Sequence, residues 1–129
     1  MSKEPLTAGF RGRIKSFVYA GRGIGILLST QVNARIHAVA TVLVLFGGLW
    51  LQISASDWAL IVLAVVAVWV AEGLNTAVEF LVDLVSPEVQ PLAGRVKDVA
   101  AGAVLIAAIG AVLVGLFVFG PPLLSVLRG

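Results

Sequence analysis

Three long apolar stretches most constrain what this chain of 129 residues can fold into. They run from about 36 to 53, from 58 to about 85 and from 99 to about 119. An α-helix rises about 1.5 Å per residue, so about 20 apolar residues cross the hydrocarbon core of a bilayer. The sequence therefore predicts three membrane helices, the third beginning near 97.

The composition excludes a water-soluble fold. Hydrophobic residues make up 60% of the chain and charged residues 12%, and the mean hydropathy is +1.07. A soluble domain of this length has too little interior to hide so much apolar surface. We expect one all-α integral membrane domain over residues 1–129. The chain has no cysteine, which excludes disulfides and thiolate metal sites, and no cleavable signal peptide is expected at its basic N-terminus.

Lysine and arginine lie mainly on one side of the predicted spans. The 54–57 connection has neither, whereas the 86–98 connection has Arg95 and Lys97. Because cationic loops stay in the cytoplasm, we expect the N-terminus and the 86–98 loop to be cytoplasmic. Arg128 opposes this orientation with a single charge. The cationic residues before the first span are Lys3, Arg11, Arg13, Lys15, Arg22 and Arg35.

The segment 10–29, FRGRIKSFVYAGRGIGILLS, is too polar and too rich in glycine to span a bilayer. Its apolar residues recur near helical spacing, with Arg11, Lys15 and Arg22 on another side, which is typical of an amphipathic helix on an anionic membrane surface. The glycines between 21 and 25 favour a kink or break. The run GRGIG follows no predicted strand and lacks the spacing of a nucleotide-binding glycine loop.

The second apolar stretch contains a stripe of polar side chains. At about 100° per residue, Glu72, Asn75, Glu79 and Asp83 fall within about 80° of one another on a helix. Acidic residues within membrane helices usually face a cavity or the interior of a bundle. Carboxylates near a cationic loop are what a metal ion with phosphate requires. The alternative, strongest for Asp83, is that they pair with Arg or Lys and only hold helices together.

Arg95, Lys97 and Asp98 gather where the third span begins. Two cations there suit either a phosphate group or ordinary anchoring at the cytoplasmic face, and the residues themselves leave both open. His37 is the only histidine. Beside Arg35 at a membrane boundary, it is expected to be an interfacial or hydrogen-bonding residue rather than a metal ligand.

The segment AEGLNTAVEFLVDLVSPEVQPLAGRVKDVAAGAVLIAAI closely resembles the prokaryotic diacylglycerol kinase and undecaprenol kinase family. That family has the pattern E-x-x-N-[ST]-A-[IV]-E-x-x-x-D, followed by a short loop and a K-D pair. SFVYAGRGI and NARIHAVA also look like its N-terminal elements, so the resemblance covers nearly the whole chain. It implies three spans and a surface helix in a bacterial inner membrane. It further implies a homotrimer with active sites shared between subunits, and phosphoryl transfer from MgATP to a lipid hydroxyl.

The resemblance also implies roles for individual residues. Glu72 would be the catalytic base on the lipid hydroxyl, with Asn75 beside it, and Glu79 would hold Mg²⁺. Other positions would contact or support the nucleotide, and these are Arg13, Tyr19, Asp83, Glu88, Arg95, Lys97 and Asp98.

Two positions depart from the family pattern. Gln31 stands where the family usually has a second metal-binding glutamate, and its amide supplies an oxygen without a charge. Gln90 replaces the usual histidine of the loop and keeps hydrogen-bonding capacity without a charge. Both remain candidate nucleotide contacts, and Gln31 remains a candidate metal contact with a weaker or altered ion affinity.

The resulting hypothesis is an ATP- and Mg²⁺-dependent lipid kinase. Undecaprenol is the favoured substrate because SPEVQPLAG and KDVAAGAVL look closer to the undecaprenol kinase branch, and diacylglycerol is the alternative. A hypothesis of another class is a non-enzymatic ion-conducting or accessory membrane protein that uses the acidic stripe as an ion path. No nucleic-acid partner is expected.

Overall fold

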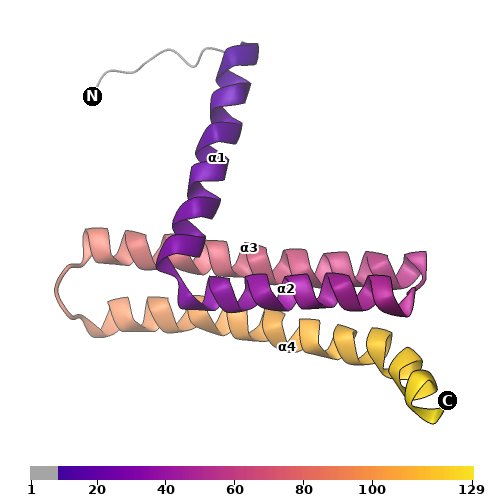
Figure 1. Ribbon diagram of the computed structural model, residues 1–129. Coiled ribbons are helices and arrows are strands. Elements are labelled where there is room, and N and C mark those ends of the chain that lie inside the picture. Colours follow the sequence, from indigo (N-terminus) through magenta and orange to yellow (C-terminus); the bar gives the residue numbers. More distant parts are fainter. Residues whose placement is uncertain (1–8) are drawn as a thin grey trace.

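The structure is a computed structural model that describes residues 9–129, so Lys3 lies outside the described residues. Its elements are α1 (Phe10–Thr30), α2 (Val32–Leu51), α3 (Ala55–Val85) and α4 (Pro91–Arg128), with no strand within 9–129 (Figure 1). Helices α2, α3 and α4 are each long and apolar enough to cross a bilayer. The predicted all-α fold with three membrane helices is confirmed.

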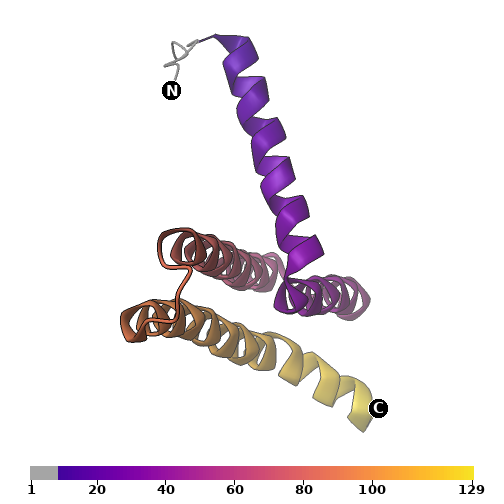
Figure 2. The same ribbon diagram turned by 90° about the vertical axis from the view of Figure 1, so that its left-hand side faces the viewer.

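Helices α2, α3 and α4 lie side by side, whereas α1 runs crosswise to them (Figures 1 and 2). The most extensive packing joins α3 to α4. The α4 face that meets α3 includes small side chains such as Ala100, Ala101 and Ala103, which let two helix backbones approach closely in a membrane. A helix that lies crosswise to the spans can lie along a membrane surface.

A tight turn reverses the chain between α2 and α3. Gln52 adopts a left-handed conformation with φ 51°, and the Ile53 amide donates to the Gly48 carbonyl at 3.2 Å. Ser54 then caps α3 by accepting from the Asp57 amide at 3.1 Å. The Trp58 ring lies over Gly48, where a side chain would collide with it. The turn therefore depends on a glycine one turn before it.

The connection between α1 and α2 is a single extended residue, Gln31, with φ −106° and ψ 119°. Arg35 reaches back from α2, and its guanidinium donates to the carbonyls of Leu28 and Ser29 at 3.0 and 2.8 Å. These carbonyls belong to the last turn of α1, where a positive charge also complements the helix dipole. Arg35 thus helps to fix the direction in which α1 leaves the bundle.

Two features of the helices differ from the sequence predictions. Helix α1 is continuous, because the glycines between 21 and 25 keep negative φ values and retain the backbone amides that a helix needs. Helix α4 extends beyond 119 to Arg128 and includes Pro121 and Pro122. It bends near its C-terminal end (Figure 1), as expected where prolines remove backbone donors and crowd the preceding turn.

Candidate functional site

The polar stripe of α3 begins one bilayer thickness from the α2–α3 turn. From Ala55 to Glu72 the helix rises about 26 Å, close to the hydrocarbon core of about 30 Å. Glu79 and Asp83 lie about 10 and 16 Å farther along the axis. Near the level of Glu72, Leu27 of α1 lines a groove together with Thr76 of α3. Glu72 thus lies at the boundary of the apolar region opposite the α2–α3 turn, and the next two acids lie beyond it.

Glu72, Asn75 and Glu79 line one cavity of about 280 Å³ between α2, α3 and α4. Glu72 is 1% exposed and Asn75 is 7% exposed. The Asn75 side-chain amide donates to Glu79 Oε1 at 3.2 Å. The structure therefore brings these three predicted residues together, with Asn75 linking the two acids.

Two buried oxygen atoms in this cavity have no hydrogen-bond partner, Glu72 Oε2 and Asn75 Oδ1. Buried polar groups are usually paired, because removing an acceptor from water without a new partner costs about 1–3 kcal/mol. Both side chains line the same cavity. This arrangement suits a cavity that receives a polar molecule.

His37 is a site residue that the sequence interpretation missed. Its Nε2 atom lies 3.7 Å from Glu72 Oε2, and its side chain lines the same cavity. A deeper hydrogen bond joins the two helices, since Trp69 Nε1 donates to Thr41 Oγ1 at 3.0 Å. The sequence does show a single histidine at the start of an apolar stretch, which could have marked it as a site residue. The spacing of residues within α2 does not show which side chains of α3 His37 would contact.

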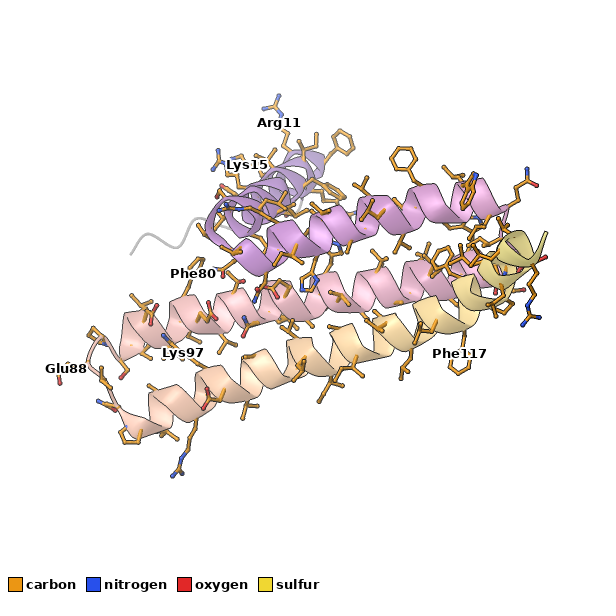
Figure 3. The ribbon with its side chains drawn as sticks, turned by 60° about the horizontal axis from the view of Figure 1, so that its bottom comes forward. Arg11, Lys15, Phe80, Glu88, Lys97 and Phe117 are labelled. Atoms are coloured by element: carbon orange, nitrogen blue, oxygen red, sulfur yellow. The ribbon has the colours of Figure 1, made fainter. Side chains whose placement is uncertain are left out.

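Asp83 and Lys97 form an ion pair between α3 and α4, with Lys97 Nζ 2.6 Å from Asp83 Oδ1. Figure 3 shows Lys97 between the two helices and Glu88 projecting from the loop that joins them. The side chains of Asp83 and Lys97 are 64% and 40% exposed. A pair this accessible contributes about 0–1 kcal/mol to stability. The alternative expectation, that Asp83 pairs with a cation and joins two helices, therefore corresponds to an actual contact, which is weak.

A second polar cavity, of about 250 Å³, lies between the end of α3, the loop and the start of α4. It brings together four predicted nucleotide contacts, which are Asp83, Glu88, Gln90 and Lys97. Arg95 and Asp98 lie in the same part of α4 as Lys97 but do not line this cavity. The loop end of the bundle therefore has both acidic and cationic groups around a hollow.

The predicted residues on α1, and Gln31 directly after it, are not brought to these cavities. Tyr19 is 62% exposed, and the Arg22 guanidinium lies 5.6 Å from the centre of its ring. Arg13, Tyr19 and Gln31 line neither polar cavity. Gln31 Nε2 donates to Thr30 Oγ1 at 3.4 Å, and within 9–129 no three His, Asp or Glu side chains form a metal cluster. Within one chain, the predicted site residues therefore lie in three separate places: the cavity beside Glu72, the loop cavity with the start of α4, and α1 with Gln31.

Comparison with known proteins identifies the family. The sequence profile of the family described as prokaryotic diacylglycerol kinase matches residues 18–119. The chain belongs to this family. It is 42% identical over 109 residues to the undecaprenol kinase of Bacillus subtilis, covering 84% of this chain and 89% of that protein.

Two diacylglycerol kinases are also similar to this family member. That of Synechocystis sp. is 44% identical over 113 residues, covering 87% of this chain and 65% of that protein. That of Escherichia coli is 36% identical over 107 residues, covering 83% and 88%. The resemblance read from the sequence is confirmed, and the relatives are named as kinases of two different lipid alcohols.

Proposed function

We propose that this protein is an ATP-dependent lipid kinase whose reaction takes place in the cavity beside Glu72. The observation that carries the proposal is the unpartnered Oε2 atom of a buried carboxylate at the boundary of the apolar region opposite the α2–α3 turn. A lipid hydroxyl lies at that depth, because its tail occupies the hydrocarbon core. The family and the names of the relatives support the same reaction.

Glu72 acts as the general base in this mechanism. Its Oε2 accepts the proton of the lipid hydroxyl as the hydroxyl oxygen bonds to the γ-phosphorus of ATP. The bond between that phosphorus and the β–γ bridging oxygen breaks, and ADP leaves with the bonding electrons. Asn75 holds Glu79 through its amide group and leaves its own Oδ1 free to accept from the substrate.

Glu79 and Gln31 are the proposed metal contacts. Mg²⁺ typically binds proteins through one or two carboxylates, with waters and substrate phosphates as the remaining ligands. Glu79 fits this chemistry, since Asn75 engages only Oε1, and Gln31 offers a neutral oxygen. When bound, Mg²⁺ neutralises charge on the β- and γ-phosphates.

The residues that line the loop cavity are the proposed nucleotide contacts, with Lys97 on a phosphate oxygen. Arg95 and Asp98, which lie on α4 outside this cavity, are further proposed contacts. Arg13 and Tyr19 lie on a helix that runs crosswise to the bundle, so we infer that they reach the nucleotide of a neighbouring subunit in a homotrimer.

Undecaprenol is the proposed acceptor, with diacylglycerol as the second candidate. The 42% identity to an undecaprenol kinase over 89% of its length supports undecaprenol, and the similarity to two diacylglycerol kinases supports the alternative. The proposed location is the bacterial inner membrane, and the distribution of Lys and Arg supports an orientation with the 86–98 loop and the N-terminus in the cytoplasm.

The test is a phosphorylation assay with γ-labelled ATP, Mg²⁺ and purified protein in mixed micelles. Undecaprenol and diacylglycerol compete at equal mole fraction, and the labelled lipids are separated. We expect label mainly in undecaprenyl phosphate. Label only in phosphatidic acid would reverse the choice of substrate. Absence of labelled lipid, together with cation flux in liposomes, would replace the kinase with the ion-conducting alternative.

A further inference from the structure

The His37 side chain occupies a boundary between two cavities. It lines the polar cavity with Glu72, and it also lines a deeper cavity of about 320 Å³ whose other walls are mostly alanine and valine. Its imidazole is 20% exposed. In the described part of the chain, no other α2 side chain lies within ion-pair distance of Glu72. The proposed reaction has so far given His37 no role.

The groups that face Glu72 from the neighbouring helices are largely apolar. Helix α4 contributes alanine, valine and leucine to the cavity, and α2 contributes an isoleucine and Asn33 in addition to His37. On α3 itself the facing polar groups are Asn75 and Glu79. Among residues 9–129, His37 is therefore the side chain of this cavity that can carry a positive charge.

The nearby cations of the bundle are engaged elsewhere. Lys97 is paired with Asp83, and the Arg35 guanidinium binds carbonyls at the end of α1. A carboxylate in apolar surroundings is strongly stabilised by one opposite charge within about 4–6 Å. A protonated imidazole at His37 would place such a charge 3.7 Å from Glu72 Oε2.

We propose that His37 is a positioning residue, whose protonated imidazole favours the ionised form of the Glu72 carboxylate and directs it toward the acceptor hydroxyl. The proposal rests on the proposed kinase function and adds a residue to it. At 3.7 Å, Nε2 is too far from Oε2 for a hydrogen bond. The imidazole therefore stabilises the charge without occupying the lone pair that receives the hydroxyl proton.

The spacing between His37 and Glu72 is fixed one turn deeper in the membrane. Thr41 Oγ1 donates to the His37 carbonyl at 2.7 Å and accepts from Trp69 Nε1 at 3.0 Å. Thr41 follows His37 by one turn, and Trp69 precedes Glu72 by nearly one turn. This bridge between α2 and α3 sets the separation of the imidazole and the carboxylate.

The first test compares His37→Ala with wild type in the micelle assay, with and without added imidazole. We expect kcat to fall about tenfold, less than the roughly 10²–10⁴-fold that a general base contributes, while KM for ATP stays nearly constant. Imidazole in solution should restore part of the lost kcat. Thr41→Val serves as a structural control, and any loss that it causes should not respond to imidazole.

A second measurement does not depend on catalysis. Dicyclohexylcarbodiimide, an apolar reagent, modifies protonated carboxyl groups, and mass spectrometry locates the adduct. We expect the fraction of Glu72 modified to rise severalfold in His37→Ala at the same pH, with Glu72→Gln as the negative control.

The outcomes separate the two proposals. Wild type that labels no lipid would contradict the kinase function, and carbodiimide labelling would still test the contact. Unchanged kcat and unchanged labelling in His37→Ala would overturn the role of His37. Loss of activity without imidazole rescue, together with a lowered melting temperature, would also overturn it and assign His37 a purely structural role.

Discussion

Lys97 Nζ lies 2.6 Å from Asp83 Oδ1, which ties the first turns of α4 to the last turns of α3 beside the loop cavity. This pair holds one of the proposed phosphate-binding cations over the hollow that the nucleotide would occupy. Its exposure means that its value lies in placing a charge rather than in stabilising the fold.

Lys97→Met should therefore weaken ATP binding far more than it weakens folding. Hydrogen bonds to charged groups contribute about 1.5–3 kcal/mol, so we expect KM for ATP to rise about tenfold or more. Asp83→Asn, which removes the ion pair but keeps the lysine, should raise KM less. Titration of ATP in the lipid assay and thermal unfolding in detergent measure the two effects. A large loss of stability with normal KM would mean that the pair only joins helices.

Gln31→Glu tests the proposed metal contact. A carboxylate adds a negative charge that Mg²⁺ favours over a neutral amide oxygen. We expect half-maximal activity at a lower Mg²⁺ concentration, measured at constant MgATP. Gln31→Asn, which keeps the amide on a shorter side chain, is the matched control. An unchanged Mg²⁺ titration in the glutamate variant would remove this position from the site.

Gly48 and Gly47 offer a matched pair for the α2–α3 turn. A Cβ at Gly48 would lie 2.6 Å from Trp58 Cη2, whereas a Cβ at Gly47 would lie 3.7 Å from Phe119 Cε1, an ordinary contact. Overpacking costs about 1–3 kcal/mol, so Gly48→Ala should be destabilised, measured by denaturation in mixed detergent micelles. Gly47→Ala should be neutral or gain up to about 1 kcal/mol from helix propensity. Equal stability of the two variants would contradict this packing.

The sequence predicted those features that depend on spacing within one helix. The stripe of Glu72, Asn75 and Glu79 follows from the helical repeat, and the structure places all three in one cavity. The three spans follow from the length of the apolar stretches. The break expected in α1 was wrong, because glycine lowers helix propensity but, unlike proline, keeps its backbone donor.

The pattern of residues within each helix does not predict the contacts between helices. The approach of His37 to Glu72 depends on how α2 rotates against α3, and no periodicity within either helix fixes that rotation. The Arg35 contact with the α1 carbonyls likewise depends on a single extended residue at Gln31. The helical repeat of α1 likewise does not predict which groups Arg13 and Tyr19 contact.

Glu72→Gln in the phosphorylation assay tests the central claim most directly, because glutamine keeps the size and loses the ability to accept a proton. We expect kcat to fall roughly 10²–10⁴-fold, with ATP affinity from equilibrium binding nearly unchanged and the thermal midpoint close to wild type. A variant that retains wild-type kcat, or that loses ATP binding in proportion to activity, would contradict the assignment of Glu72 as the base.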